Sequence, residues 1–397
     1  MLYFAHQIKA SDRVLEVMRK RGVALLAGET RTGKTRVAIR VAELSKAKHV
    51  LVLTKKAAIA GWTSELEAVK PKTRFTVTNY EQAAKLADDF DLLVLDESHN
   101  LGRPGKPSKR FKIIRTLAYK KPLLCLSGTP MVETKLSIYY QFALTQYSPF
   151  KTFKSFYRFF DEYGLPSRIR VNGYFVEQYV KAKPELLAVI EPYIITLTQD
   201  KAGIAHKAID KVHEIELLPA TIALLEQIKT DKVATIAGVE YGFDSDMGER
   251  AALHQLEAGA VKLGNKFIML PNTELVDYIR KEFGDKPSVA VMCHYHSTRE
   301  KIKQHLPNVQ IYSSNAHAEG VDLSHYEHFI IANSAYSGAK FVQRRDRIVN
   351  INRTSKAVVH HLVAKKQLSA AVYAAVCKKH DFNLELYRHY ARTATTV

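Results

Sequence analysis

The chain has 397 residues, of which 46% are hydrophobic and 25% are charged, and its net charge is +19. This is the composition of a soluble globular protein with room for two or three domains, and the positive charge favours a polyanionic partner. No apolar stretch approaches the length of a membrane span and the N-terminal residues lack a signal-peptide pattern, which excludes a membrane-spanning or secreted protein; we expect a cytoplasmic one. The cysteines (Cys125, Cys293 and Cys377) lie far apart, so we expect reduced thiols and no metal site.

The first predicted elements are a strand, a glycine loop and a helix. An apolar run over Val23–Ala27 precedes the loop GETRTGKT, and an amphipathic run over Arg36–Ala42 follows it. The loop matches the pattern G-x-x-x-x-G-K-[ST], in which backbone N–H groups and a helix N-terminus face the phosphates of a nucleoside triphosphate. There Lys34 would neutralise the β- and γ-phosphates and the Thr35 hydroxyl would bind Mg²⁺. The predicted nucleotide-binding residues of the loop are Gly28, Glu29, Thr30, Arg31, Thr32, Gly33, Lys34 and Thr35.

Further short apolar runs alternate with helical stretches in the first and last parts of the chain. They are Val23–Ala27, His49–Thr54, Arg74–Asn79, Leu92–Asp96 and Leu123–Ser127, then Ser288–Cys293, Val309–Ser313, His328–Asn333 and Ala357–Val363. Such alternation predicts parallel sheets that are covered by helices on both faces. The expected fold class is therefore α/β, with two parallel-sheet lobes over residues 1–145 and 266–397.

Residues 146–265 have a different sequence pattern and form the predicted inter-lobe region. Phenylalanines recur at helical spacing over residues 150–163, which favours a packed core over a base-stacking platform. The Asn172-Gly173 pair between alternating segments predicts a β-hairpin. Helices are expected over Glu185–Ile195 and Ala220–Lys229, and a loop over Gly238–Gly248.

Two adjacent carboxylates end the apolar run that precedes His99. Placed at the end of a strand beside the glycine loop, Asp96 would hold Mg²⁺ through water and Glu97 would polarise the attacking water. A solvated turn is the alternative explanation, and the upstream glycine loop argues against it.

The ordered set of motifs resembles the Swi/Snf-type (Snf2-like) ATPases of helicase superfamily 2. GETRTGKT and DESH are similar to motifs I and II of that family, and the LSGTP sequence at Leu126–Pro130 is similar to motif III. Phe4–Gln7 stands at the position of the Q motif, so Gln7 would contact the adenine. The resemblance implies two RecA-like lobes with a helical and hairpin insertion between them, and ATP and Mg²⁺ as cofactors.

Other blocks correspond to nucleic-acid contacts of the family. The run Leu51–Thr54 with Trp62 and Glu65 resembles motif Ia, and Val77–Glu81 resembles motif Ib. The predicted contacts with the phosphate backbone are Lys55, Lys56, Thr78, Asn79, Ser313 and Ser314. Charge agrees with this assignment, because residues 1–145 carry 26 basic and 13 acidic side chains and residues 266–397 carry 19 and 11, whereas residues 146–265 carry 14 and 16.

The last part of the chain resembles motifs IV to VI. Gly320 and Asp322 are the best matches to motif V and are assigned to the nucleotide. Motif VI in the family has two arginines three residues apart, and here Arg347 fills the first position and Asn350 the second. Arg353, Arg344 or Arg345 could replace the missing arginine. The predicted catalytic residues are Lys34, Asp96, Glu97, Arg347 and Arg353.

The resemblance implies an ATP-dependent DNA translocase or helicase that acts as a monomer on duplex or branched DNA with little sequence specificity. Branch migration or remodelling, in recombination and repair, are the expected uses. The hairpin resembles compact members from bacteria and phages. Two alternatives stay open: an RNA helicase of the same superfamily, and an ATP-gated nucleic-acid clamp without net movement. A P-loop kinase would leave the LSGTP motif unexplained.

Overall fold

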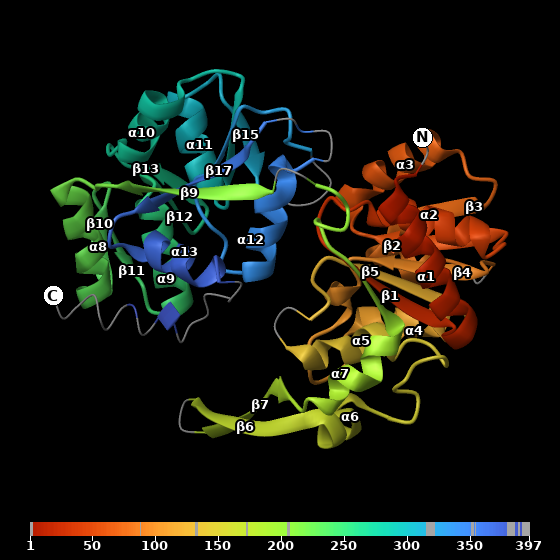
Figure 1. Ribbon diagram of the computed structural model, residues 1–397. Helices are drawn as coiled ribbons and strands as arrows, with labels where there is room; N and C mark the ends of the chain where they lie inside the picture. The colour runs from red at the N-terminus through yellow and green to blue at the C-terminus, as the bar shows by residue number, and fades with distance from the viewer. Residues whose placement is uncertain are drawn as a thin grey trace. The chain divides into compact units, whose positions relative to one another are not determined.

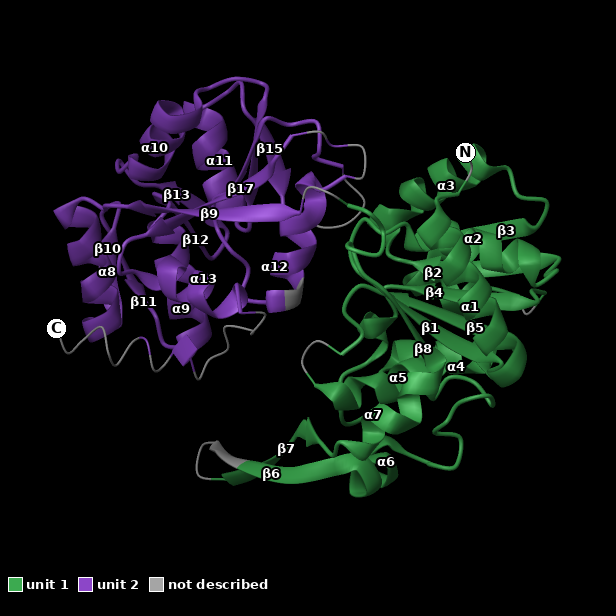
Figure 2. Cartoon of the chain, viewed as in Figure 1, with its two compact units in different colours: residues 1–205 green, residues 206–397 purple. Residues whose placement is uncertain are grey.

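The computed structural model describes residues 3–87, 89–131, 134–171, 174–204, 207–314, 322–350, 353, 355–378, 386–387 and 390. The chain divides into two compact units, Met1–Ala205 and His206–Val397 (Figure 2). Each unit is built on one parallel sheet with flanking helices, so the predicted α/β fold class with two RecA-like lobes is confirmed. The segment 146–265 is shared between the units, and the three-part division of the chain stays a prediction. No helix in the described ranges is long and apolar enough to cross a membrane.

Unit 1 contains a six-stranded parallel sheet in the order β3-β2-β4-β5-β1-β8 (Figure 1). Its strands are β1 (Val23–Gly28), β2 (His49–Thr54), β3 (Arg74–Asn79), β4 (Leu92–Asp96), β5 (Leu123–Ser127) and β8 (Ile194–Leu197). The first five agree with the apolar runs of the sequence. The helix expected over Glu185–Ile195 is wrong at its C-terminal end, because α7 spans Glu185–Ile190 and Ile194 already pairs with Leu25 of β1. Pro192 lacks a backbone donor and the β-branched residues after it favour a strand.

Successive side chains of these strands point into two separate cores. On one face, Leu26 and Val94 pack against α1 (Ala5–Arg21), α2 (Lys34–Leu44) and α3 (Ile59–Val69). On the other face, Leu25 and Leu95 pack with the helices α4 (Lys109–Ala118), α5 (Tyr139–Phe142), α6 (Phe156–Tyr163) and α7. This two-sided burial explains why the strands are continuously apolar in the sequence. The phenylalanines at 150, 153, 156, 159 and 160 all belong to or pack against the second core, as predicted.

A two-stranded antiparallel arm extends from unit 1 beside α6 (Figure 1). It consists of β6 (Gly164–Val171) and β7 (Tyr174–Ala182), which confirms the predicted hairpin. The Asn172-Gly173 turn itself lies outside the described residues. Tyr174 and Phe175 are 78% and 73% exposed, so the arm presents aromatic rings to solvent.

Unit 2 has a five-stranded parallel sheet in the order β15-β14-β16-β17-β9. The strands are β9 (Ala208–Ile215), β14 (Val289–Cys293), β15 (Gln310–Ser313), β16 (His328–Ile331) and β17 (Ala357–Ala364). The helices are α8 (Pro219–Asp231), α9 (Asp246–Leu256), α10 (Glu274–Phe283), α11 (His296–His305), α12 (Gly338–Arg345) and α13 (Leu368–Val376). Two small hairpins complete the unit, β10 (Val233–Ile236) with β11 (Val239–Gly242) and β12 (Ala260–Leu263) with β13 (Lys266–Met269).

The loop expected over Gly238–Gly248 is wrong, because this segment holds β11 and the start of α9. A tight turn joins β10 to β11, with positive φ angles of 52° at Ala237 and 77° at Gly238. The Ser245 side chain then caps α9 by accepting a hydrogen bond from the N–H of Gly248. Strand β11 has four residues, too few to show an alternation of apolar and polar side chains. Ser245, a residue type that caps helices, was the available sequence signal for the start of α9.

Candidate active site

The glycine loop connects β1 to α2 in the way the pattern predicts. Gly33 adopts a left-handed φ of +82°, and a Cβ at this position would lie 2.2 Å from Nε2 of Gln7. Gln7 of α1 is 3% exposed and its Oε1 accepts a hydrogen bond of 3.0 Å from the N–H of Phe4. Glycine is therefore required at position 33 by both its backbone angle and the close approach of Gln7. The two predicted nucleotide elements, the Q-motif glutamine and the loop, lie together.

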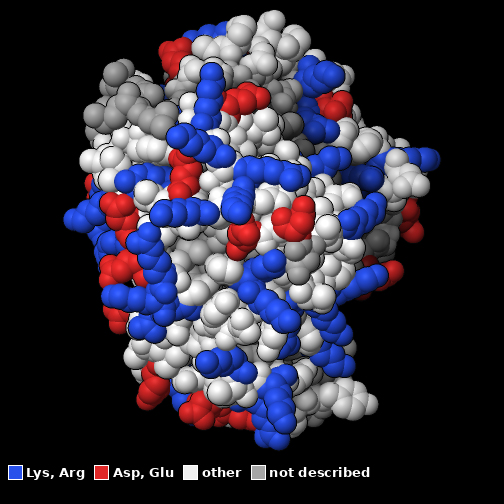
Figure 3. Space-filling model, turned by 90° about the vertical axis from the view of Figure 1, so that its right-hand side faces the viewer, with Lys and Arg blue, Asp and Glu red and all other residues white. Residues whose placement is uncertain are grey.

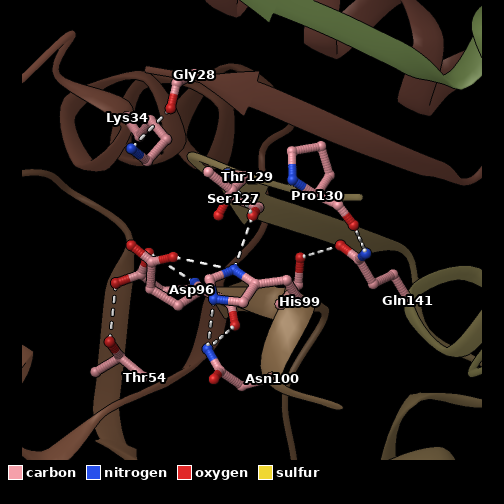
Figure 4. Close-up of polar contacts among 12 residues, drawn as sticks. Gly28, Lys34, Thr54, Asp96, His99, Asn100, Ser127, Thr129, Pro130 and Gln141 are labelled. Carbon is pink, nitrogen blue, oxygen red and sulfur yellow. Dashed lines mark hydrogen bonds and ion pairs between the residues drawn. The ribbon is translucent and has the colours of Figure 1, made fainter. Parts of the chain in front are cut away.

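Lys34 lies along the inside of this loop. Its Nζ donates hydrogen bonds to the carbonyl oxygens of Gly28, at 2.9 Å, and Glu29, at 3.3 Å. A Cβ on Gly28 would come within 2.7 Å of Lys34 Cγ, so glycine makes room for the lysine. A Cβ on Gly128 would lie 3.8 Å from Lys34 Nζ, which places the LSGTP loop beside the same ammonium group (Figure 4).

The remaining loop residues are held by local bonds. The Thr32 hydroxyl is buried and donates to the carbonyl oxygen of Glu29 at 2.8 Å. Arg31 has a positive φ of 66°. Thr35 lies in the first turn of α2 and is half-buried. Alternating right- and left-handed backbone angles turn successive N–H groups toward a common point, which suits an anion.

Asp96 ends β4 and is 9% exposed. Its Oδ2 accepts hydrogen bonds from Thr54 Oγ1 (2.8 Å) and Trp62 Nε1 (2.9 Å), and its Oδ1 accepts one from the N–H of Glu97 (3.0 Å). Tyr80 donates to the carbonyl oxygen of Asp96 at 2.6 Å. Burial first, and then the Asp96 carboxylate, raise the pKa of Tyr80, so its hydroxyl stays a donor. The donors from Thr54, Trp62 and Glu97 hold the carboxylate in one orientation.

The partners of Asp96 show what the sequence reasoning missed. Thr54 was noted only as part of an apolar run, and Trp62 only as part of a motif. The structure places the Trp62 indole, 2% exposed, as a direct donor to the predicted magnesium-binding carboxylate. A lone tryptophan with a buried N–H needs a polar partner, and this requirement was the signal that could have found it.

Glu97 has a left-handed φ of +52°, which is uncommon for a residue with a side chain. Its Oε2 lies 3.2 Å from Nδ1 of His99, and its carbonyl oxygen accepts a hydrogen bond of 2.9 Å from Asn100 Nδ2. His99 Nδ1 is hydrogen-bonded to Ser127 Oγ at 2.9 Å. The half-buried carboxylate of Glu97 therefore lies beside the His99 imidazole.

Two hydrogen-bond chains join the DESH segment to the LSGTP segment (Figure 4). In the first, His99 bonds to Ser127 Oγ, which accepts the N–H of Thr129 at 3.1 Å. In the second, Ser98 donates to Gln141 Oε1 at 2.7 Å, and Gln141 Nε2 donates to the carbonyl oxygen of Pro130 at 2.6 Å. A displacement of one segment must therefore disturb the other.

The predicted Mg²⁺ ligands, Thr35 and Asp96, offer a hydroxyl and a carboxylate oxygen, which are the hard donors that this ion takes. Both Asp96 oxygens already accept protein hydrogen bonds but keep lone pairs, which suits contact with the ion through water. The donor set fits Mg²⁺ bound by few protein groups and by substrate phosphates.

Four of the predicted nucleic-acid contacts lie at the same edge of the unit 1 sheet. Lys55 and Lys56 follow β2, while Thr78 and Asn79 end β3. The register pairs Leu53 with Thr78, so the two strand ends are adjacent. Because all strands of this sheet are parallel, their carboxyl ends share an edge with the glycine loop and Asp96. Lys56 is exposed and the others are half-buried.

Unit 2 gives a different result for the pair Ser313 and Ser314. Ser313 ends β15 and is half-buried. Ser314 is only 1% exposed, and its carbonyl oxygen accepts a hydrogen bond of 3.0 Å from Arg344 Nη2. The Ser314 side chain is therefore buried in the interior of unit 2. Gly320 lies outside the described residues, and Asp322 Oδ2 accepts a hydrogen bond of 3.0 Å from Asn350 Nδ2.

The candidate arginines of motif VI are held in different ways. Arg344 is 1% exposed, and burial lowers its pKa to about 10, which leaves it charged at neutral pH. Arg345 pairs with Asp210 at 2.8 Å. Arg353 donates to the carbonyl oxygens of Ser324, Ile348, Tyr326, Ser355 and Lys356. Arg347 is half-buried on the short 3₁₀ helix Asp346–Ile348.

No known family profile matches the chain. It is 24% identical over 420 aligned positions to a Xenopus tropicalis protein named "SWI/SNF-related matrix-associated actin-dependent regulator of chromatin subfamily A-like protein 1", with 89% of the chain and 42% of the relative aligned. The Xenopus laevis protein of the same name is 25% identical, over 71% of the chain and 31% of the relative. The chain thus spans less than half the length of these relatives.

A solved structure titled "Sulfolobus solfataricus SWI2/SNF2 ATPase core in complex with dsDNA" aligns with 99% of the chain and 94% of its own length, with a TM-score of 0.45 and 17% identity. The curated relatives and the ordered motifs agree in pointing to the Snf2-like ATPases. The chain, with these motifs carried on two parallel-sheet units, is similar to the Snf2-like members of superfamily 2.

Proposed function

We propose that this protein hydrolyses ATP and couples the hydrolysis to movement along DNA. The observation that carries the proposal is the convergence of Lys34, Asp96 and Glu97 with the LSGTP loop at one edge of the unit 1 sheet. Phosphoryl transfer to water needs positioned charges more than covalent help, and this edge supplies them.

Each residue has a distinct task in the proposed reaction. The loop N–H groups and Lys34 bind the phosphates, and Lys34 exchanges its bonds to the Gly28 and Glu29 carbonyls for phosphate oxygens. Thr35 and Asp96 would hold Mg²⁺, which neutralises charge on the β- and γ-phosphates. Glu97 orients the attacking water, and Arg347 is proposed as the arginine that stabilises the transition state.

The hydrogen-bond chains through Ser127 and Gln141 suggest how the cleavage of ATP reaches the rest of unit 1. Loss of the γ-phosphate releases Lys34 and the water beside Glu97, and the bonds from His99 and Ser98 pass that change to the LSGTP loop. The proposed coupling element is therefore a pair of short hydrogen-bond chains whose members are buried or half-buried.

Charge supports a nucleic-acid partner. Residues 1–205 carry 34 basic and 19 acidic side chains, whereas residues 206–397 carry 25 and 21. Lys and Arg side chains spread over the face shown in Figure 3. Contacts with phosphates through Lys55, Lys56, Thr78 and Asn79 would give strong salt dependence and little sequence specificity. The names of the curated relatives, which are regulators of chromatin, favour DNA over RNA.

Steady-state ATP turnover should be measured with duplex DNA, branched DNA, single-stranded DNA and RNA at two salt concentrations. We expect stimulation by duplex or branched DNA that falls as salt rises. Stimulation by RNA alone would overturn the choice of DNA. A triplex-displacement assay then tests movement: ATP-dependent displacement supports translocation, and tight DNA binding without displacement supports the ATP-gated clamp.

A further inference from the structure

The chain returns to the glycine loop after the hairpin arm, through strand β8 and the residues that follow it. Strand β8 pairs with β1, and the N–H of Glu29 donates to the carbonyl oxygen of Leu197 at 2.9 Å. Gln199, 6% exposed, then donates from its backbone N–H to Glu29 Oε2 at 2.6 Å. Its side-chain Nε2 donates to the carbonyl oxygen of Thr30 at 3.1 Å.

The bond to Thr30 controls a specific donor of the loop. The carbonyl of Thr30 and the N–H of Arg31 belong to one planar peptide unit and point in opposite directions. Fixing the carbonyl toward Gln199 therefore fixes the direction of the Arg31 N–H. Arg31 has a left-handed φ of 66°, the conformation in which neighbouring N–H groups converge on an anion.

The same glutamine begins the segment that leads to unit 2. The turn after it is closed by the N–H of Ile204, which donates to the carbonyl oxygen of Gln199 at 3.1 Å. Ala202 and Ile204 are each 4% exposed, so the side chains of this turn are buried. Strand β9 of unit 2 starts at Ala208, nine positions after Gln199.

We propose that Gln199 is a positioning residue that orients the Thr30–Arg31 peptide for phosphate and links occupancy of the glycine loop to the turn 200–204 that follows it. The inference rests on the proposed nucleotide binding and goes beyond it. A loop that closes on phosphate moves the Thr30 carbonyl, and the bond from Gln199 transmits that movement to this turn.

The test compares Gln199→Met with the unchanged protein. Methionine keeps the length of the side chain and the backbone N–H but removes the amide donor. We expect KM for ATP to rise about 5- to 10-fold, the worth of one buried hydrogen bond, with kcat nearly unchanged because Asp96 and Glu97 are untouched. Trypsin cleavage after the exposed Lys201 and Lys207 should slow when a non-hydrolysable ATP analogue and Mg²⁺ bind the unchanged protein. That protection should disappear in the variant.

Gln146→Met is the matched control, because Gln146 is exposed in the same unit and also bonds through its backbone N–H, to the carbonyl oxygen of Tyr119 at 2.9 Å. It should behave as the unchanged protein does. If Gln199→Met fails to fold, Gln199→Glu replaces it, and its carboxylate facing the Thr30 carbonyl should raise KM at least as much. The inference would be overturned if a folded variant had the same KM for ATP as the unchanged protein and the same protection from trypsin by the nucleotide. Absence of nucleotide binding by the unchanged protein would instead overturn the proposed function.

Discussion

The glycine-loop region of unit 1 and the motif VI region of unit 2 use their charged side chains differently. In unit 1, Lys34 donates to carbonyl oxygens of its own loop, and Asp96 is oriented by hydroxyl, indole and amide donors. In unit 2, Arg345 is paired with Asp210, and Arg353 is surrounded by carbonyl oxygens. A charged side chain that binds a ligand can exchange its protein hydrogen bonds for bonds to that ligand. A charged side chain that stabilises the fold keeps its protein partners.

The sequence left Arg353, Arg344 and Arg345 as substitutes for the second arginine of motif VI, and each of them contacts groups of unit 2. Arg344 and Arg353 stabilise the loops of unit 2 by binding their carbonyl oxygens. Asn350, which stands where the family has its second arginine, bonds to Asp322. Arg347 fills the first arginine position of motif VI, and the following experiments compare its proposed catalytic role with the structural role of Arg353.

The largest effect is expected for Lys34→Ala. Removing the ammonium group leaves the phosphate charge uncompensated, and ATP turnover should fall to background while circular dichroism stays unchanged. Lys120→Ala, which changes an exposed lysine of the same unit, is the control. Turnover retained in Lys34→Ala would contradict the assignment of the loop.

Glu97→Gln should stop hydrolysis but keep nucleotide binding, because the amide has the shape of the carboxylate and cannot orient and polarise water as a carboxylate does. Binding of a fluorescent ATP analogue and turnover are measured on the same sample. Glu67→Gln, an exposed glutamate of α3, should change neither quantity. Equal loss of binding and turnover would make Glu97 structural.

The variants Arg347→Ala and Arg353→Ala test the different roles assigned to these two arginines. Arg347→Ala should lower kcat by about 10³-fold or more, as loss of an arginine finger does, with little change in the urea midpoint. Arg353→Ala should instead reduce the free energy of unfolding by about 1–3 kcal/mol, because buried carbonyl oxygens lose their donor. The reverse outcome would show that the ungapped assignment of motif VI is wrong.

Trp62→Phe keeps the ring in the core but removes the Nε1 donor to Asp96. A hydrogen bond to a charged group is worth about 1.5–3 kcal/mol, so turnover should fall about tenfold or more and the Mg²⁺ concentration for half-maximal activity should rise. Val69→Ala, at the other end of α3, is a control for packing loss alone. If both variants lose stability equally and keep the same Mg²⁺ dependence, Trp62 only fills space.

Shortening the hairpin arm between Arg168 and Tyr179 should have the smallest effect on basal ATP turnover. The strands of the arm are mostly exposed, and their tip carries the solvent-exposed Tyr174 and Phe175. We expect the response to branched DNA to fall more than the basal rate. Equal loss of both would show that the arm only supports the core around α6.

Local sequence predicted those parts of the molecule that depend on neighbouring residues. The glycine loop, the apolar strands and the β6–β7 pairing follow from residue spacing, and each was found where expected. The strand β8 and the helix start at Asp246 were missed. Ile194–Leu197 forms a strand because it pairs with the edge of β1. The local sequence has no pattern that predicts this distant pairing.

The sequence by itself determined the residue types of the candidate site: a lysine in a glycine loop, two carboxylates at a strand end and a family pattern around them. Only the tertiary structure decided which groups hold those residues. Trp62 meets Asp96 across 34 positions and Gln199 meets Glu29 across 170, and neither spacing is visible as a motif. A parallel sheet brings the ends of distant strands to one edge, so the bonds that orient its catalytic residues come from segments that are remote in the chain.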